Sequence, residues 1–272
     1  MRHIFFRFFA SLLFALPVSA QDSTPSQAIT ALEARIAELE TLNAELINRL
    51  LDLEATKNGL LTDQVRAALM DDPSMIFDAV EEFERQQIAM QADIYADDLN
   101  GDPFLPVLGN PDGDITLVEF FDYNCGYCRR AMDDVLSLVE SDGNIRLILK
   151  ELPILSEHSQ TASLNALAAA QDVDYLALHR AAMLSNGTVD GQIVAQIAGE
   201  LGADVEALQA RLERNQDSYL SALSRTRDLA QALGISGTPA FYIEGEVIPG
   251  AVSREELARR IADIRAARGA DS

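Results

Sequence analysis

Two cysteines, Cys125 and Cys128, are the residues whose type and spacing most clearly allow chemistry. They enclose Gly126 and Tyr127, and the 272-residue sequence contains no other cysteine. An apolar run typical of a strand precedes them and a segment with helical spacing follows, which places Cys125 at a helix N-terminus. Unpaired backbone N–H groups and the helix dipole favour a thiolate there, and the thiolate is the attacking species in disulfide exchange. We therefore predict that Cys125 is an exposed nucleophile and that Cys128, one helical turn away, is a partly buried resolving thiol.

Other uses of this cysteine pair fit less well. A disulfide between such close neighbours closes a very short loop, so it adds little stability. A zinc site needs two further ligands, and the only histidines after residue 20 are His158 and His179. We interpret both as ordinary helix residues, and we expect no bound metal or other cofactor. Copper(I) binding by the two soft thiolates stays open.

A second motif, Gly237-Thr238-Pro239, directly precedes a short apolar run over residues 240–243. A proline that leads into a strand is commonly a trans turn residue, so the motif alone leaves its role open.

The segment Val118–Arg129, taken together with Gly237-Thr238-Pro239, resembles the DsbA-like family of periplasmic oxidoreductases, which have the thioredoxin fold. The resemblance covers roughly residues 104–270. It implies that Pro239 is cis, packs against the two cysteines and helps to bind the substrate backbone. It also implies that Thr238 tunes the redox poise, and that Gly126 and Tyr127 contribute to substrate binding beside Thr238 and Pro239.

Three charged residues lie in or directly after the apolar strands. Glu119 stands six positions before Cys125, inside a strand that we predict to be buried. Burying a carboxyl group without a partner is costly, so Glu119 either assists proton transfer at Cys128 or lies on the surface of the sheet. Lys150 and Glu151 end the next strand, and we predict that both are solvated.

The dipeptide Gly126-Tyr127 bears on the direction of electron flow. Strongly oxidising DsbA proteins carry Pro-His between their cysteines, and a histidine can add positive charge near the thiolate. Gly126-Tyr127 contributes no cation, so we predict a less oxidising pair. The same dipeptide with a Thr-Pro loop resembles the dimeric isomerase DsbC.

A seven-residue repeat precedes this region and predicts a coiled-coil stalk over residues 21–62. One heptad position holds Leu32, Leu39, Leu46, Leu53 and Leu60; the other holds Ile29, Ile36, Asn43, Leu50 and Lys57. Isoleucine, leucine and one asparagine in this pattern favour a parallel dimer, with a trimer still open. An amphipathic helix folded back on its own domain is the alternative.

A helical N-terminal segment is predicted over residues 63–98, and Asp71-Asp72-Pro73 interrupts it. The part from Val65 to Gln87 is similar to the N-terminal region of the ScsC-type branch. Members of that branch can oligomerise through this region and act as disulfide isomerases or copper-tolerance proteins. The polar stretch 91–102 is the expected boundary between this segment and the catalytic domain.

Residues 104–272 are expected to form an α/β domain with the thioredoxin fold. The predicted strands are 106–108, 115–121, 145–149, 240–243 and 246–248. Helices are predicted over 129–141, over 157–233 as an insertion broken at 186–187 and 202, and from Ser253 onward. The order predicts a small mixed sheet with a helical insertion.

The first 20 residues predict an export signal. Arg2 and Arg7 precede an apolar run over 8–18, and Val18-Ser19-Ala20 is a small-residue cleavage site. An uncleaved anchor is the alternative. Export from the cytoplasm predicts a periplasmic protein, and a formal net charge of −22 argues against nucleic-acid binding.

We therefore expect a periplasmic thiol–disulfide oxidoreductase, and more specifically an oligomeric disulfide isomerase or reductase. Its partners would be protein substrates with cysteines and a membrane redox protein that resets the pair. A DsbA-like oxidase is the alternative within the same class. A coiled-coil envelope scaffold, or a copper(I)-binding protein without turnover, is the alternative from another class.

Overall fold

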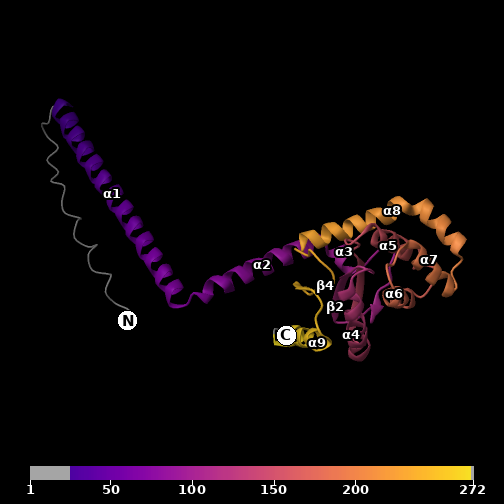
Figure 1. Ribbon diagram of the computed structural model, residues 1–272. Helices are drawn as coiled ribbons and strands as arrows, with labels where there is room; N and C mark the ends of the chain where they lie inside the picture. Colours follow the sequence, from indigo (N-terminus) through magenta and orange to yellow (C-terminus); the bar gives the residue numbers. More distant parts are fainter. Residues whose placement is uncertain (1–24, 271–272) are drawn as a thin grey trace. The chain divides into compact units, whose positions relative to one another are not determined.

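The computed structural model describes residues 25–270 (Figure 1). The predicted export signal, residues 1–20, lies outside the described residues. The chain divides into two compact units, residues 1–76 and 77–272, and each is described by itself. Among residues 25–270, no helix is long and apolar enough to cross a membrane.

The described part of the first unit is dominated by one long helix, α1 (Pro25–Asp71). It ends where the sequence predicts a break, and Asp72 then opens α2 (Ser74–Ile94) by accepting a hydrogen bond from Ser74 N at 3.1 Å. The heptad leucines Leu32, Leu39, Leu46 and Leu53 are 53–69% exposed in the single chain. A coiled coil needs a continuous helix over the heptad repeat, and α1 provides one. In the single chain these leucines are not packed against other residues, whereas a coiled-coil partner would bury them.

Five strands form one mixed sheet in the second unit, in the order β1-β3-β2-β4-β5. The strands are β1 (Leu108–Gly109), β2 (Ile115–Phe121), β3 (Ile145–Glu151), β4 (Ala240–Ile243) and β5 (Glu246–Pro249). β2 and β3 are parallel, whereas the other neighbours are antiparallel. β2 occupies the centre, and six of its seven residues are buried. Its β-branched and aromatic side chains suit such a strand, because both faces are covered.

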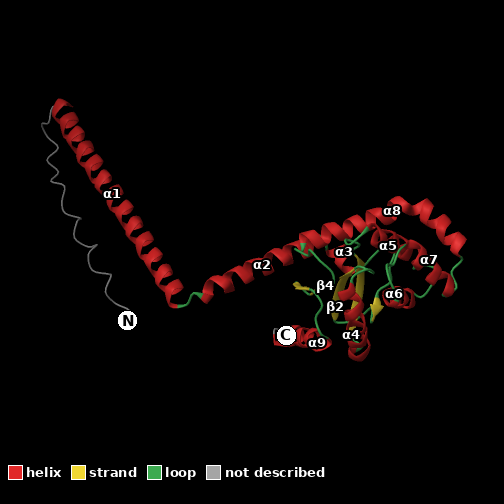
Figure 2. Cartoon of the chain, viewed as in Figure 1, coloured by secondary structure: helices red, strands yellow, loops and turns green. Residues whose placement is uncertain are grey.

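Helices cover both faces of this sheet, as Figure 2 shows with strands in yellow and helices in red. They are α3 (Ala96–Asn100), α4 (Gly126–Asp142), α5 (Glu157–Ala169), α6 (Tyr175–Leu184), α7 (Gly191–Glu200), α8 (Val205–Ala232) and α9 (Arg254–Ala270). The larger core joins alternate β2 side chains with residues of α4 to α9. The smaller core joins Val118 and Phe120 with α3 and the end of α8, and Ile88 and Ala92 of α2 pack against it.

Several sequence predictions need correction in this fold. The first strand is Leu108–Gly109 and not 106–108, and it pairs with β3. A turn follows it, with Gly113 N donating to Asn110 O at 3.0 Å. The insertion has a further break after α5, at 170–174, where Asp174 caps α6. α2 continues to Ile94, and α3 follows within the stretch that we predicted as a polar boundary.

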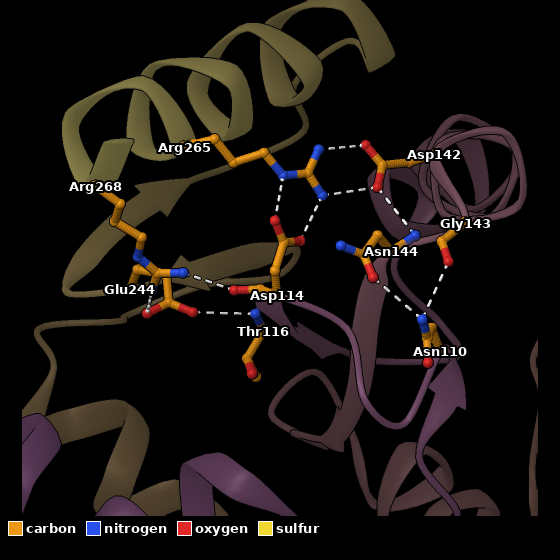
Figure 3. Close-up of polar contacts among 9 residues, drawn as sticks. All are labelled: Asn110, Asp114, Thr116, Asp142, Gly143, Asn144, Glu244, Arg265 and Arg268. Atoms are coloured by element: carbon orange, nitrogen blue, oxygen red, sulfur yellow. Dashed lines mark hydrogen bonds and ion pairs between the residues drawn. The ribbon is translucent and has the colours of Figure 1, made fainter. Parts of the chain in front are cut away.

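The C-terminal helix is fastened to the sheet by a network of charged residues (Figure 3). Arg265 donates two hydrogen bonds to Asp114, at 2.7 and 2.8 Å, and two to Asp142, at 2.7 and 2.8 Å. Arg268 donates to the Asp114 carbonyl oxygen at 2.6 Å and pairs with Glu244 in the β4–β5 turn. α9 is thereby tied to the start of β2, the end of α4 and the β4–β5 turn.

Candidate active site

Cys125 lies directly before α4, at the end of the short turn that connects the central strand β2 with this helix. Its backbone is extended, with φ −81° and ψ 112°, and it is the N-cap residue of α4. The Cys125 N–H donates to Asp122 O at 2.9 Å, which closes the turn between strand and helix. The Cys125 sulfur accepts a hydrogen bond from Cys128 N at 3.4 Å. A sulfur that caps a helix in this way faces the backbone donors and the positive end of the helix dipole.

The Thr238-Pro239 loop covers Cys125. Its peptide bond is cis, and the Cys125 sulfur lies 3.1 Å from the Thr238 carbonyl oxygen, to which the thiol donates a hydrogen bond when it is protonated. Cys125 is therefore only 5% exposed and Cys128 is fully buried. The prediction that Cys125 is exposed is wrong for this free state of the chain, because it took no account of a loop from more than 100 residues away.

The two thiols have opposite acidities. The hydrogen bond from the Cys128 side chain, with backbone donors at Tyr127 and Cys128, outweighs burial and lowers the Cys125 pKa from 9.0 to about 5. The same side-chain hydrogen bond, together with burial, raises the Cys128 pKa well above 9.0. At neutral pH, Cys125 is a thiolate and Cys128 is a protonated donor that stabilises it.

Glu119 is buried beneath this pair and only 3% exposed, so it does not lie on the sheet surface. Its side chain points to the same face of β2 as Leu117 and Phe121, which share the larger core with both cysteines. Burial, and then the negative charge of Cys125, raises the Glu119 pKa from 4.5 to about 8. The Glu119 charge in turn contributes to the raised pKa of Cys128. A carboxyl group that titrates near neutral pH can take up or release a proton during turnover.

Asn124 and Arg129 hold the helical insertion against the cysteine turn, and the sequence analysis missed both. The Asn124 side chain exchanges two hydrogen bonds with the Val189 backbone, at 2.7 and 2.8 Å, and donates one to Ser159 Oγ at 3.1 Å. Arg129 donates to Ser185 O at 2.7 Å and to Gly187 O at 3.1 Å. The one feature of the sequence that could have pointed to Asn124 and Arg129 is their position beside the cysteines. Their hydrogen-bond partners in the insertion could not be predicted, because these lie more than 30 residues further along the chain.

The Asp122 carboxylate links the cysteine turn to the chain that follows β3. One carboxylate oxygen accepts from Asn124 N at 2.8 Å. The other accepts from Ile154 N at 3.0 Å and Leu155 N at 3.1 Å, which fixes the chain after β3. The Asp122 side chain is fully buried, and these three backbone donors satisfy it there. The turn that carries Cys125 is thus braced on both sides.

The prediction that Lys150 and Glu151 are solvated is wrong, because each is only 1% exposed. Glu151 accepts hydrogen bonds from Ser163 at 2.7 Å, Tyr123 at 2.9 Å and Tyr175 at 3.2 Å. Burial outweighs these donors and raises its pKa to about 8. Lys150 lies on the other face of β3 and pairs with Asp102 at 3.4 Å.

The two histidines differ in their surroundings. His158 is exposed at the start of α5. His179 is buried in α6 among aromatic rings, with its ring centroid 4.7 Å from that of Phe121. Burial, with a contribution from Arg180, lowers the His179 pKa to about 3, so it is neutral. His179 is therefore a core residue of its helix.

Tyr127 and Gly126 form the outer side of the cysteine turn. Tyr127 is 61% exposed, and the Arg130 guanidinium lies over its ring at 4.3 Å from the centroid. The sequence analysis considered only Gly126 and Tyr127 and therefore expected no positive charge beside the cysteines. The Arg130 guanidinium, one turn further along α4, supplies a positive charge at the Tyr127 ring.

Residues 116–262 match the family of DSBA-like thioredoxin domains. Among solved structures, a thioredoxin-like oxidoreductase from Silicibacter pomeroyi DSS-3 is 46% identical, with a TM-score of 0.58 over 62% of this chain and 96% of that one. The catalytic domain of Proteus mirabilis ScsC is 30% identical, with a TM-score of 0.56 over 66% of this chain and 97% of that one.

Curated relatives match more than half of the chain. Disulfide bond formation protein D of Bacillus subtilis (strain 168) is 25% identical over 61% of this chain and 80% of its own length. Na(+)/H(+) antiporter NhaA 1 of Salinispora arenicola (strain CNS-205) is 26% identical over 57% of this chain. The chain spans about a quarter of the length of that antiporter. The predicted resemblance and the thioredoxin fold with a helical insertion are both confirmed.

Proposed function

The chain belongs to the family of DSBA-like thioredoxin domains, and from that membership we propose that it is a thiol–disulfide oxidoreductase acting on protein substrates. Cys125 is its nucleophile and Cys128 its resolving thiol. Within this class, we propose that it works as an oligomeric disulfide isomerase or reductase.

The observation that carries the proposal is the opposite acidity of two thiols three residues apart. Cys125, with a pKa of about 5, is ionised and ready to attack a substrate disulfide. Its attack forms a Cys125–substrate disulfide and expels the other substrate sulfur as a thiolate, so electrons and charge balance. Cys128, whose pKa is raised, keeps its proton during this step and does not compete for the substrate.

Two outcomes follow from the mixed disulfide. If the expelled thiolate attacks another disulfide of the substrate, it releases a different substrate thiolate. When that thiolate attacks the substrate sulfur of the mixed disulfide, a new substrate disulfide forms and Cys125 leaves as a thiolate, which is isomerisation. If Cys128 loses its proton and attacks Cys125, the substrate leaves reduced and the Cys125–Cys128 disulfide forms, which is reduction. We propose that Glu119 accepts the Cys128 proton, because its pKa of about 8 matches that task.

The N-terminal helix supports the oligomeric part of the proposal. Leu32, Leu39, Leu46 and Leu53 of α1 are exposed, and each would gain about 1.5–3 kcal/mol on burial in a coiled coil. At about 1.5 Å per residue, the 47 residues of α1 make a stalk of roughly 70 Å. Several sites on one assembly could hold a misfolded substrate while one thiolate acts, and the Gly126-Tyr127 dipeptide agrees with a less oxidising pair.

We further propose that residues 1–20 direct export, that the protein works in the periplasm, and that a membrane redox protein resets the cysteine pair. The substrate-binding roles of Gly126, Tyr127, Thr238 and Pro239 belong to the same proposal. Thr238 supports it directly, since its carbonyl oxygen lies 3.1 Å from the nucleophilic sulfur.

Insulin reduction tests the oxidoreductase. We expect turnover by the full chain and none by Cys125→Ser, while Cys128→Ser should accumulate a mixed disulfide with the insulin chains. Equal and negligible rates for the wild type and Cys125→Ser would refute the enzyme and favour the scaffold alternative. Copper(I) titration of the same two proteins addresses metal binding, since chelation by the pair would be lost in Cys125→Ser.

Refolding of a scrambled multi-disulfide substrate tests the isomerase. The full chain should restore substrate activity, and deletion of residues 21–60 should lower the rate while insulin reduction continues. The mass of each protein in solution, measured by light scattering, must show that the deletion abolishes the oligomer. If the deleted chain isomerises as fast as the full chain, the stalk has no part in the activity. Rapid oxidation of reduced substrates without isomerisation would favour the oxidase.

A further inference from the structure

A groove of about 600 Å³ runs away from the covered nucleophile. Its floor is the loop from Gly234 to Pro239, one wall is the end of β5 with the following Gly250, and the other wall is α2. Thr238 is common to the groove and the cysteine pair, because it lines the groove and its carbonyl oxygen lies 3.1 Å from the Cys125 sulfur. A substrate cysteine joined to Cys125 would therefore lie close to the residues that line this groove.

The wall from α2 contains Glu84, Gln87 and Ile88. This helix lies outside residues 116–262, the part that matches the family. It stays in place because Ile88 and Ala92 pack against the smaller core. The groove therefore combines the shared loop at Pro239 with a wall that is particular to the N-terminal region of this chain.

Glu84 sets the electrostatic character of the groove. It is the one charged side chain among the described residues that line it, and it is exposed. The neighbouring Arg85 pairs with Glu82 instead, so the Glu84 carboxylate has no ion pair within residues 25–270. A peptide in the groove thus meets apolar and backbone groups together with one uncompensated negative charge.

We propose that this groove binds the extended segment beside the reacting cysteine of a protein substrate, and that Glu84 selects segments with a lysine or arginine. The proposal rests on the oxidoreductase function, and it names the substrate chemistry that the site prefers. An exposed ion pair is worth about 0.2–1 kcal/mol, which corresponds to a preference of about 1.5–5-fold in rate.

A single exchange step measures this preference. Full-length Cys128→Ser is reacted with two peptides of equal length, each carrying its cysteine as a disulfide with thionitrobenzoate and flanked by lysines or by glutamates. The Cys125 thiolate attacks the peptide sulfur, a Cys125–peptide disulfide forms, and the thionitrobenzoate anion leaves and absorbs light. Mass spectrometry confirms which sulfur is attached to Cys125.

Glu84→Lys is compared with Asp78→Lys in the Cys128→Ser background. Both variants change the net charge of the chain equally, but exposed Asp78 lies about 240° around the helix from residue 84 and does not line the groove. We expect Glu84→Lys to lower or reverse the lysine preference by about 2–10-fold relative to Asp78→Lys. The difference should vanish in about 1 M salt, where charges are screened within about 3 Å.

Each other result is decisive. The same lysine-to-glutamate rate ratio in both variants would overturn the role of Glu84 while the exchange function stands. Equal slowing of both peptides in Glu84→Lys, accompanied by a change in mass by light scattering, would mean that a second copy of the chain occupies the groove. If no peptide reacts faster than it does with free cysteine, the oxidoreductase function and the substrate preference both fail.

Discussion

Replacing Glu119 with glutamine should stabilise the protein and slow its resolving step. The Glu119 pKa is raised from 4.5 to about 8, chiefly by burial and then by the charge of Cys125. An acid with a higher pKa in the folded than in the unfolded chain binds its proton more tightly when folded. Its contribution to stability is complete below pH 4.5 and is progressively lost as the pH rises through 8.

The size of the effect follows from these two values. Each pH unit between them costs about 1.4 kcal/mol, so the wild type loses roughly 3 kcal/mol between pH 4.5 and pH 7 through Glu119 alone. Glutamine does not titrate, so the difference in unfolding free energy between Glu119→Gln and the wild type should grow by that amount. Glu151, whose pKa is also about 8, is present in both proteins and cancels in the difference.

Urea unfolding of the reduced proteins, followed by circular dichroism from pH 4.5 to 8 at one protein concentration, measures this difference. A difference that stays constant over the whole range would refute the assignment of a buried, neutral Glu119. The Thr62→Val variant, with its change in the exposed α1 helix, provides a matched control with no new pH dependence.

The same variant tests proton transfer. General acid–base groups contribute about 100-fold or more to a rate, so the disulfide between Cys125 and a peptide should persist about 100-fold longer in Glu119→Gln. Acid quenching followed by mass spectrometry gives that lifetime. An unchanged lifetime, together with the expected stabilisation, would show that Glu119 is a costly buried acid without a part in resolving the mixed disulfide.

Three further outcomes are expected. Alkylation of Cys125 by iodoacetamide should rise with a midpoint near pH 5, and Cys128→Ala should move the midpoint upward because the donor to the thiolate is lost. Asn124→Ala should lower the unfolding free energy by about 1–3 kcal/mol in urea, since three hydrogen bonds to the insertion disappear. Arg265→Ala should cost about 1 kcal/mol at pH 7. Arg265 holds the pKa values of Asp114 and Asp142 below 3.8, so that loss should fade in thermal melts as the pH falls below 3.8.

Local patterns in the sequence were enough to place Cys125 at the start of its helix. An apolar run followed by a cysteine and a helical pattern specifies a strand that ends at a helix N-terminus, and the structure has Cys125 as the cap of α4. The break at Asp72 was predictable for the same reason, because Pro73 acts on the backbone within a few residues.

Burial by distant elements could not be predicted in this way. Lys150 and Glu151 look like the polar end of a strand. Yet Lys150 pairs with Asp102 in the loop after α3, and Glu151 accepts hydrogen bonds from Ser163 and Tyr175 of the insertion. The cover over Cys125 comes from Thr238, 113 residues away. Such contacts depend on how whole elements pack, which no short sequence window contains.

The structure also changes which residues are expected to set the direction of electron flow. The hydrogen bonds that lower the Cys125 pKa come from the Cys128 side chain, from Thr238 and from the backbone of Cys128 and Tyr127, whereas the Tyr127 side chain faces outward beneath Arg130. The dipeptide therefore acts on the sulfur through its backbone, and its aromatic side chain stays exposed. What then separates an isomerase from an oxidase is the time that a substrate stays near the thiolate before Cys128 attacks. In the mixed disulfide Cys125 carries no charge, so burial is the main remaining cause that keeps the Cys128 pKa high and slows its attack. A groove that binds the substrate, repeated on an oligomer, would lengthen that time further.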